Sequence, residues 1–349
     1  MLKVGLDTSP LYGPSGVRGV GKYVAQLLPA LRSTKKVKIV EFKDSFNLRT
    51  VELIHYPYFD FFFLTLPFFK NKKTVVTIHD CTPLVFPEIY PPGMRGKIKF
   101  FLQKMSLRNV SAVVADSECS KKDIIQFLGI PQEKIKVIYL AADSDYKKIP
   151  QEGRWPAMIR KKYDLGENFL LYVGDVNPNK NLERLLRVFA QMPQDYDLVL
   201  VGKAFKNLRL PEVRKITALI KELGIKKRVK FPGFVPGNDL AKIYNLAKVF
   251  CLPSLYEGFG LSILEAMACG CPVLTSNVSS MPEVAGEAAV LVDPNSEESI
   301  LDGLKKLTSD SKLRDQLVTR GFAQAKKFTW HKTAEETVEV YKQVLANEK

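Results

Sequence analysis

The chain has 349 residues and the composition of an ordinary folded protein, with 46% hydrophobic and 26% charged residues. That length is long for a single hydrophobic core, so we expect two domains, and the composition excludes a disordered chain. The net charge of +15 is uneven, because residues 1–165 hold 27 Lys and Arg against 15 Asp and Glu, whereas residues 166–349 hold 25 against 22. The first half is therefore expected to meet an anionic partner, which nucleic acid, an acidic membrane surface or a phosphorylated substrate would satisfy.

The sequence carries no pattern of a secreted or membrane-spanning protein. Its start, MLKVGLDTSP, is typical of a strand and lacks the basic and apolar regions of a secretory signal. The most apolar stretch, residues 57–69, is too short to cross a bilayer and contains Asp60. Five cysteines without a CxxC pair argue against a disulfide framework and a zinc site. We therefore expect a cytoplasmic protein without a bound metal. Asp143-Ser144-Asp145 has the pattern of a DxD metal site, and we interpret it as a solvated turn.

Strand-like runs alternate with amphipathic runs along the whole chain. In the first half, strands are predicted at 3–7, 37–42, 52–56, 74–80, 112–117 and 136–141, and helices at 20–33, 95–108 and 119–129. After a polar stretch over 143–165, further strands are predicted at 169–175, 197–202, 227–233, 248–254, 271–276 and 288–293. The helices of this second series are predicted at 181–192, 212–224, 238–247, 261–269, 296–308 and 311–327. This alternation predicts an α/β protein with two doubly wound, Rossmann-like domains.

The domain boundary is expected near residue 165. The first domain would cover residues 1–165 and the second residues 166–330, and a C-terminal helix within 331–349 would cross back to the first domain. Because ligands of such sheets bind outside the carboxyl ends of the strands, the motifs at those ends are the candidates for a functional site.

The strongest candidate is the segment 256–273, YEGFGLSILEAMACGCPV. Gly258 and Gly260 permit a tight turn whose backbone N–H groups can approach a ligand, and the positive end of the helix that follows suits a phosphate. Glu257 stands before the turn and Glu265 inside the helix, so the two carboxylates can contact one ligand at its two ends. An ordinary loop with two solvated glutamates is the alternative.

A second candidate is YVGDVNPNKN, residues 172–181, where a predicted strand ends and a helix follows. Lys180 stands at the start of that helix, and a lysine beside a helix N-terminus is suited to binding a diphosphate. A solvated lysine is the alternative, and Asn181 fits the role of a plain helix cap equally well.

A third candidate is VVTIHDCTPL, residues 75–84, in which His79 follows a run of strand residues. A histidine at the carboxyl end of a strand can hydrogen-bond a substrate hydroxyl or take part in proton transfer. A structural histidine with satisfied hydrogen bonds is the alternative.

The glycine-rich turn GPSGVRGVGKY, residues 13–23, lies between the first strand and the first helix. Such a turn can bring the backbone close to a phosphate. The spacing of its glycines does not match the dinucleotide fingerprint, and no ribose-binding acid follows the next strand, so a nicotinamide-dependent enzyme is disfavoured.

Together these motifs resemble the retaining glycosyltransferases of family 4, which have the GT-B fold of two Rossmann-like domains facing across a cleft. The resemblance covers nearly the whole chain. The matching elements are the E-x7-E element from Glu257 to Glu265, the lysine motif PNKN, the histidine motif TIHD, the glycine turn RGVGKY, and the segments SSMPEVAGEAAVLVDP and FTWHKTAEETVEVY.

The resemblance implies a role for each motif. Glu257 would hold sugar hydroxyls, Glu265 would bind the ribose hydroxyls, Lys180 would neutralise the leaving diphosphate, and His79 would contact the donor sugar near the anomeric centre. The residues implied to bind the donor through backbone or hydroxyl groups are Gly19, Gly258, Phe259, Gly260, Leu261 and Ser262.

The resemblance also implies the substrates. The enzyme would transfer a hexose, of mannose or glucose type, from GDP-mannose or a UDP-hexose with retention of configuration, and would need no cofactor and no metal. Asp175 and Asn179 occupy the positions where the family often has a basic residue beside the lysine motif. Lys203, after the strand DLVLVG, is our candidate for a second phosphate clamp.

The acceptor side is suggested by the segment 94–109, MRGKIKFFLQKMSLRN, in which five basic residues are interleaved with aromatic and aliphatic ones. A basic amphipathic helix of this kind can lie on an anionic bilayer, and the neighbouring phenylalanine run 61–69 adds to that interpretation. A helix that packs its apolar face on its own sheet is the alternative. The resulting hypothesis is a glycan or lipid-linked acceptor reached by peripheral binding at the inner face of the membrane.

Two other functions remain open at this point. A sugar-nucleotide epimerase of the same fold would use the same donor site without an acceptor. A non-enzymatic nucleic-acid-binding protein would explain the charge, but not Glu257 and Glu265 beside a phosphate-type turn, and the sequence has no RNA-binding pattern of stacking aromatics. We therefore expect no nucleic-acid partner.

Overall fold

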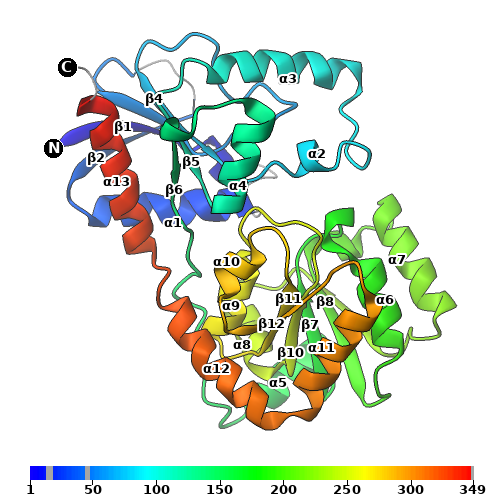
Figure 1. Cartoon of the computed structure of the whole chain (residues 1–349). Coiled ribbons are helices and arrows are strands. Elements are labelled where there is room, and N and C mark those ends of the chain that lie inside the picture. The colour runs from blue at the N-terminus through cyan, green and yellow to red at the C-terminus, as the bar shows by residue number, and fades with distance from the viewer. Residues whose placement is uncertain (13–18, 44–47, 347–349) are drawn as a thin grey trace. The chain divides into compact units, whose positions relative to one another are not determined.

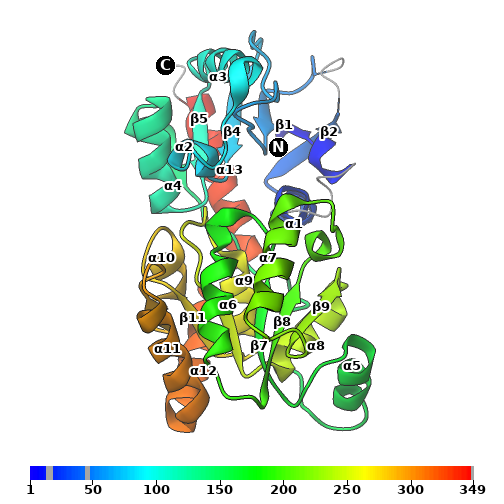
Figure 2. The ribbon, with the colours of Figure 1, turned by 90° about the vertical axis from the view of Figure 1, so that its right-hand side faces the viewer.

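The computed structural model describes residues 1–12, 19–43 and 48–346, which form two compact units (Figures 1 and 2). The first unit comprises Met1–Ala141 and Phe328–Lys349, and the second comprises Ala142–Lys327. Each unit is an α/β structure built on a parallel six-stranded sheet, as the sequence predicts, and each is described by itself below. Residues 13–18 of the predicted glycine-rich turn lie outside the described residues.

The first sheet has the strand order β2-β1-β3-β4-β5-β6. Its strands are β1 (Leu2–Asp7), β2 (Val37–Phe42), β3 (Leu53–Tyr56), β4 (Lys73–Ile78), β5 (Ala112–Ala115) and β6 (Ile135–Val137). Every residue of β3 and β5 is buried, which explains why these strands are apolar runs without the alternation of a solvated sheet. All six predicted strands are found.

Helices cover this sheet on both faces. The helices of the first unit are α1 (Gly19–Ser33), α2 (Thr82–Val85), α3 (Gly93–Leu107), α4 (Glu118–Asp123) with the π turn η4 (Ile124–Leu128), and α13 (Trp330–Ala346), and the short 3₁₀ turns are η1 (Ser9–Leu11) and η5 (Gln132–Lys134). The C-terminal helix α13 packs against α1 (Figure 1). Hydrogen bonds also hold it in the first unit, since the Tyr341 hydroxyl lies 2.7 Å from Nδ1 of the buried His55 and Thr333 donates to the carbonyl of Tyr139 at 2.7 Å.

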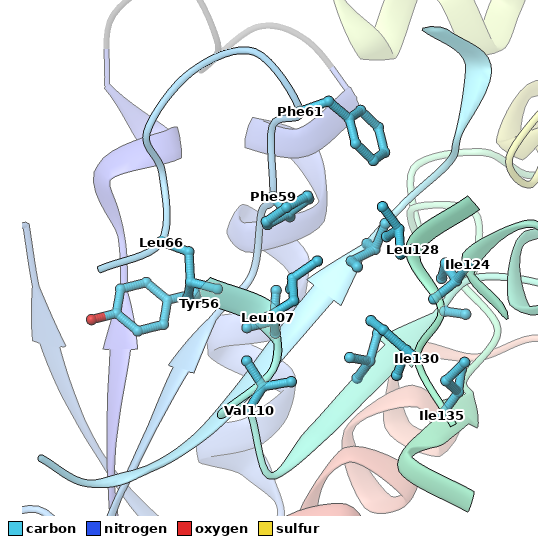
Figure 3. Packing of buried hydrophobic residues seen from close by; sticks show 14 of the residues in the cluster. Tyr56, Phe59, Phe61, Leu66, Leu107, Val110, Ile124, Leu128, Ile130 and Ile135 are labelled. Carbon is cyan, nitrogen blue, oxygen red and sulfur yellow. The ribbon is translucent and has the colours of Figure 1, made fainter. Parts of the chain in front are cut away.

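A hydrophobic cluster fills the space between the first sheet, η4 and the segment that joins β3 to β4 (Figure 3). Phe59 and Phe61 from that segment are buried in it beside residues of β3 and η4, such as Tyr56 and Ile124. Within the phenylalanine run 61–69, Phe61 therefore belongs to the core, while Phe63 and Phe69 are exposed.

The second sheet has the strand order β12-β11-β10-β7-β8-β9. Its strands are β7 (Asn168–Val173), β8 (Tyr196–Val201), β9 (Val229–Gly233), β10 (Val249–Leu252), β11 (Val273–Ser276) and β12 (Ala289–Val292). Their interiors are continuous apolar runs such as VFCL in β10, where all four residues are buried. The six strands predicted for this half are again all found.

The helices of the second unit form two layers (Figure 1). One layer contains α6 (Leu182–Ala190), α7 (Pro211–Glu222) and α11 (Glu297–Ser309), and the other contains α5 (Trp155–Tyr163), α8 (Gly237–Leu246), α9 (Leu261–Ala268), α10 (Met281–Ala285) and α12 (Ser311–Ala325). Two 3₁₀ turns, η6 (Pro178–Lys180) and η7 (Lys203–Lys206), follow β7 and β8. The helices α2, α5 and α10 were not predicted. Those at 82–85 and 281–285 are very short, and α5 lies within the polar stretch 143–165.

The boundary between the units differs from the expected one near residue 165. The structure divides the chain after Ala141, because the stretch expected to be a linker packs on α8 of the second unit. The Tyr146 and Tyr244 rings are 5.8 Å apart, and Asn245 donates to the carbonyl of Lys147 at 2.9 Å.

This boundary also changes the charge asymmetry. The first unit holds 24 Lys and Arg against 15 Asp and Glu, and the second holds 28 against 22, so the net charges are +9 and +6. The excess of positive charge in the first unit is smaller than the excess in residues 1–165. An anionic partner would therefore be bound by local patches of exposed basic residues, and not by the charge of a whole unit.

Candidate active site

The strand order of the second sheet places a switch point between β7 and β10. The chain passes from β7 to β8 and β9 on one side, then returns to form β10, β11 and β12 on the other side of β7. Ligands of doubly wound sheets bind outside the carboxyl ends of the strands at such a switch point. The loops that follow the neighbouring strands β7 and β10 carry Lys180 and Glu257.

Lys180 and Glu257 form a close ion pair. The Nζ atom of Lys180 lies 2.7 Å from both carboxylate oxygens of Glu257, and their side chains are only 18% and 11% exposed. The hydroxyl of Ser254 donates a further hydrogen bond to Oε1 of Glu257 at 2.7 Å. The structure thus joins, across 77 positions of sequence, two residues that the motifs identify separately.

Two asparagines beside Lys180 bind the two loops together. Nδ2 of Asn179 donates to the carbonyl of Tyr256 at 3.0 Å, and Nδ2 of Asn181 donates to the carbonyl of Pro253 at 2.9 Å. Asn181 occupies the position before α6, but its side chain makes no capping hydrogen bond. The role of a plain helix cap is therefore wrong for Asn181, because its amide is used to connect the loops.

Serines that the sequence analysis assigned no role hold the backbone around Glu257. The Ser279 hydroxyl donates to the carbonyl of Glu257 at 2.6 Å and accepts from its N–H at 3.2 Å. The Ser280 hydroxyl lies 2.9 Å from that carbonyl and 3.0 Å from the carbonyl of Phe259. In the sequence, only the adjacent pair of serines within SSMPEVAG could have indicated this role, and no local pattern relates that pair to residue 257.

The helix α9 follows this loop, and the first backbone amides of the helix make no hydrogen bond within the described residues. Gly260 has φ of 92°, a left-handed conformation that favours glycine, and a Cβ there would lie 3.1 Å from the side chain of Ile263. Among the described residues, the N–H groups of Leu261 and Ser262 have no hydrogen-bond partner. Two free amides at the positive end of a helix make a site for an anion such as a phosphate.

Glu265 is buried one turn into α9. Its Oε2 atom accepts a hydrogen bond from the hydroxyl of Tyr244 at 3.1 Å, and the hydroxyl of Tyr146 is bonded to the same carboxylate. Burial raises the pKa of both tyrosines, and the charge of Glu265 raises it further, so both hydroxyls keep their protons. The carboxylate is thereby held in one orientation by two donors, which the sequence analysis did not foresee.

Lys203 lies at the same edge of the second sheet, in η7 after β8. It is exposed, and the described residues include no hydrogen-bond or ion-pair partner for it. The backbones of β7 and β8 approach closely here, since a Cβ on Gly202 would lie 2.1 Å from the carbonyl oxygen of Gly174. The structure places Lys203 beside the strand that leads to Lys180.

His79 belongs to the first unit, at the carboxyl end of β4. Its Nδ1 atom lies 2.7 Å from Oδ2 of Asp116 and its Nε2 atom 3.0 Å from the carbonyl of Pro57. Burial by itself lowers the pKa of His79, but the carboxylate of Asp116 and the carbonyl of Pro57 outweigh it, and the net direction is upward. Both ring nitrogens face acceptors, so the arrangement favours the doubly protonated imidazolium.

Asp116, which follows β5, is the functional candidate that the motifs missed in the first unit. It is buried, and its second oxygen, Oδ1, has no hydrogen-bond partner among the described residues. An aspartate directly after the strand AVVA was a usable signal, because the histidine motif also follows a strand and β4 and β5 are neighbours in the sheet.

Gly19 is the first residue of α1, also in the first unit. Within the described ranges, a Cβ at this position would meet no atom within 4 Å, so those residues do not require glycine there. The role implied for Gly19, close approach to a diphosphate, stays a prediction.

The Asp143-Ser144-Asp145 segment forms a local turn, in which Oδ1 of Asp143 accepts from the N–H of Asp145 at 3.3 Å. In the part of the chain that the structure describes, no group of three or more His, Cys, Asp or Glu side chains is arranged to hold a metal ion.

Comparison with known families agrees with this geometry. A family model described as glycosyl transferases group 1 matches residues 156–324, which contain the Lys180–Glu257 pair and Glu265. A model described as glycosyltransferase family 4 matches residues 41–146, which contain His79 and Asp116.

Characterised relatives are similar over most of the chain. O-antigen chain mannosyltransferase B of Escherichia coli is 33% identical over 280 residues, which cover 78% of this chain and 71% of that protein. Serotype-specific mannosyltransferase WbdA of Escherichia coli is 31% identical, and the match covers 78% of this chain but only 34% of that longer protein. A Campylobacter jejuni transferase, whose name gives an acceptor linked to diphospho-undecaprenol, is 28% identical over 77% of this chain and 70% of its own length.

A solved structure shows the same fold. The sucrose-phosphate synthase of Thermosynechococcus elongatus superposes with a TM-score of 0.78 over 100% of both chains, at 21% sequence identity. Identity this low supports the fold alone, and that fold is the GT-B arrangement of two Rossmann-like sheets with flanking helices.

Proposed function

The chain belongs to glycosyltransferase family 4, and we propose that it transfers mannose from GDP-mannose to a glycan or lipid-linked acceptor with retention of configuration. The choice of mannose is supported by relatives named as mannosyltransferases that match 78% of the chain. UDP-hexoses are the alternative donors. The observation that carries the proposal is the Lys180–Glu257 ion pair beside the free amides at the N-terminus of α9.

This arrangement suits the departure of a diphosphate. As the bond between the anomeric carbon and the diphosphate oxygen breaks, its electron pair goes to that oxygen and the sugar becomes oxocarbenium-like. The ammonium of Lys180 and the amides of Leu261 and Ser262 offer positive charge and hydrogen-bond donors that are already fixed. Fixed donors stabilise the charge that develops in the transition state more than the ground state, which accelerates transfer.

The two glutamates would hold the two ends of the donor. Glu257 would accept hydrogen bonds from sugar hydroxyls once its oxygens are shared between Lys180 and the ligand. Glu265, held in place by Tyr244, would accept from the ribose hydroxyls. Lys203 would add a second positive charge for the phosphates. Charge-assisted hydrogen bonds of this kind are about twice as strong as neutral ones.

The acceptor proton needs no dedicated carboxylate pair of the glycosidase type. In same-face transfer the acceptor oxygen forms its bond to the anomeric carbon, and the proton it loses passes to the departing phosphate oxygen. His79 is suited to a different task, since the interactions of both its nitrogens favour the imidazolium. A cation held by Asp116 would contribute positive charge near the donor sugar.

We propose further that α3 places the enzyme on the inner face of a membrane. Four exposed residues of this helix, spaced at i, i+4, i+7 and i+8, form one apolar stripe: Met94, Ile98, Phe101 and Leu102. Arg95 and Lys97 beside them are exposed as well. An exposed apolar stripe flanked by cations is the pattern of a helix that lies on an anionic bilayer. No helix within the described residues is long and apolar enough to cross a membrane.

The donor proposal is tested by incubating the purified chain with GDP-mannose, UDP-glucose and UDP-galactose, with and without a lipid-linked mannosyl glycan. We expect mannosylated product and stoichiometric GDP only when GDP-mannose and acceptor are both present. Conversion of the donor to its epimer without acceptor would establish the epimerase instead. Salt-sensitive RNA binding without binding of any donor would establish the nucleic-acid-binding protein.

The membrane proposal is tested by co-sedimentation with phosphatidylglycerol and phosphatidylcholine vesicles. We expect binding to the anionic vesicles at low salt, and a roughly 30-fold loss of binding in the double variant Arg95→Gln/Lys97→Gln, because each basic residue near the surface contributes about 1 kcal/mol. Lys122→Gln/Lys136→Gln removes the same charge elsewhere on the first unit and is the matched control. Equal losses in both double variants, or no binding at all, would contradict the proposal.

A further inference from the structure

The first unit contains a cavity of about 660 Å³ to which the motifs assign no role. It opens at the carboxyl ends of three neighbouring strands, where Asp7 ends β1, Phe42 ends β2 and Tyr56 ends β3. Its other side is formed by residues 64–68, from the segment that joins β3 to β4, and by α3. A volume of this size is typical of a small-molecule site.

The position of the cavity is the one where doubly wound sheets bind ligands. The chain passes from β1 to β2 on one side and returns to β3 on the other, so β1 and β3 flank the switch point of the first sheet. Crevices outside the carboxyl ends at a switch point are the usual ligand sites of such folds. The position of the cavity in the fold therefore indicates a ligand site, whichever residues line it.

One wall of the cavity is polar. It is formed by the strand ends and is lined by Asp7, Lys43 and Tyr56, and the ammonium of Lys43 lies 3.3 Å from the centre of the Tyr12 ring. Burial and the neighbouring charge of Asp7 raise the pKa of Tyr56 to about 12, so this hydroxyl stays protonated. This wall offers charge and hydrogen bonds to a polar group.

The opposite wall is apolar. Leu64, Leu66, Phe68 and Leu102 line it. Its one buried amide, on Gln103, is used within the protein, since Nε2 donates to the carbonyl of Asp60 and to the Thr65 hydroxyl, both at 3.0 Å. This wall therefore has apolar surface to offer a ligand.

The apolar wall connects the core to the exposed stripe of α3. Tyr56 and Leu66 belong both to the cavity and to the hydrophobic cluster of the first unit, where Figure 3 shows them beside each other. Leu102 belongs both to the cavity and to the stripe proposed to lie on the membrane. Through Leu102, the apolar wall of the cavity is thus continuous with the stripe.

We infer that this cavity binds the lipid end of a lipid-linked acceptor. The first segment of the hydrocarbon chain lies against Leu64, Phe68 and Leu102, and the polar head lies against the strand ends with Lys43. This inference rests on the proposed function, and it adds to it the class of acceptor and its binding site. A free glycan would use the polar wall alone.

Binding is tested with a polyprenyl phosphate that carries a photoreactive diazirine near the head of its chain. After irradiation in detergent, mass spectrometry should find the label on peptides that contain residues 64–68 and 102–106. Two variants, Phe68→Ser and Leu102→Ser, remove side chains that line the cavity and are 45% and 38% exposed. Each should lower the labelling about tenfold, because it removes a large apolar contact with the chain.

The chain provides a control of the same residue type for each variant. Phe69 and Leu208 are 88% and 66% exposed, and neither lines the cavity. Phe69→Ser and Leu208→Ser should therefore leave the labelling within about twofold of the unsubstituted protein. If all four variants lose labelling equally, the chain only adheres to the exposed surface, and the inference is wrong. Label on other peptides would overturn it as well.

A kinetic comparison separates this inference from the proposed function. With a lipid-linked glycan as acceptor, Phe68→Ser and Leu102→Ser should raise KM about tenfold, whereas with the same glycan freed of its lipid both should match the unsubstituted enzyme. Transfer that is active but insensitive to these variants would refute the cavity and leave the proposed function intact. Labelling of the cavity without transfer from any donor would refute the proposed function and retain the lipid site.

Discussion

The ammonium nitrogen of Lys180 lies 2.7 Å from each carboxylate oxygen of Glu257, in a contact that is largely shielded from water. The two residues come from neighbouring strand ends, β7 and β10, and neither motif contains the other. In the proposed reaction each has its own partner, the diphosphate for Lys180 and the sugar for Glu257. The ion pair therefore orients both groups before the donor arrives, which reduces the reorganisation that transfer requires.

Replacing Lys180 by methionine should slow transfer far more than it weakens donor binding. We expect kcat to fall roughly 100- to 1000-fold, the size of the effect when one fixed charge-stabilising group is lost. The donor Kd should change only a few-fold, as measured by isothermal titration. The matched control is Lys215→Met, which breaks the exposed ion pair with Glu183 and should leave kcat unchanged.

The same variant should also destabilise the second unit, because the carboxylate of Glu257 would lose its cation while remaining mostly buried. A loss of about 1–3 kcal/mol in the free energy of unfolding is expected from urea titration. Lys180→Met/Glu257→Gln should recover most of that stability without recovering kcat. A double variant as active as the unsubstituted enzyme would rule out the assigned roles.

Replacing Glu265 by glutamine should weaken nucleotide binding through the ribose. We expect the Kd for GDP to rise about tenfold or more, because ribose hydroxyls lose a charged acceptor. The Kd for 2′,3′-dideoxy-GDP should be the same for both proteins, since that ligand lacks the hydroxyls. An equal loss of affinity for both ligands would show that Glu265 acts on the fold of α9, through Tyr244, and not on the ribose.

Replacing Asp116 by asparagine should lower the pKa of His79 below the ordinary value near 6.5. Burial alone lowers this pKa, and the carboxylate of Asp116 is the largest effect that raises it. NMR titration of the ring protons, in the variant and in the unsubstituted protein, reports the change directly. Transfer at pH 7 should fall roughly tenfold as the imidazolium is lost. An unchanged pKa in the variant would refute the paired arrangement.

His55 should make the first unit sensitive to acid. Burial lowers the pKa of His55 to about 3, so the folded protein keeps it neutral while the unfolded chain binds a proton below about 6.5. Between these values the unfolded state holds more protons, and stability falls as the pH falls, by at most about 1.4 kcal/mol per pH unit. His79, whose pKa is raised, has the opposite sign and loses its contribution as the pH rises.

The test compares urea unfolding at pH 7 and pH 5 for the unsubstituted protein and for His55→Gln, which retains a polar partner for Tyr341. The difference in unfolding free energy between the two pH values should shrink by about 2 kcal/mol in the variant. If the two proteins show the same difference, His55 is not kept neutral by the fold.

The sequence by itself determined the two series of parallel strands, the motifs at their ends and the family. Buried parallel strands are apolar on both faces, so runs such as FLLYV and KVFCL mark them without any knowledge of their neighbours. Glycines before a helix likewise mark a turn whose backbone can approach a ligand, because that preference is local.

Only the tertiary structure decided which side chains meet. Lys180 and Glu257 are 77 positions apart and His79 and Asp116 are 37 apart, and each pair is adjacent because the order of strands in a sheet differs from their order in the chain. The order of strands also created the cavity between β1, β3 and α3, and packing on α8 attached residues 142–165 to the second unit. The local sequence pattern determines the hydrophobic period and the ends of a helix or strand. Packing between elements that are distant in the sequence determines which elements lie beside it.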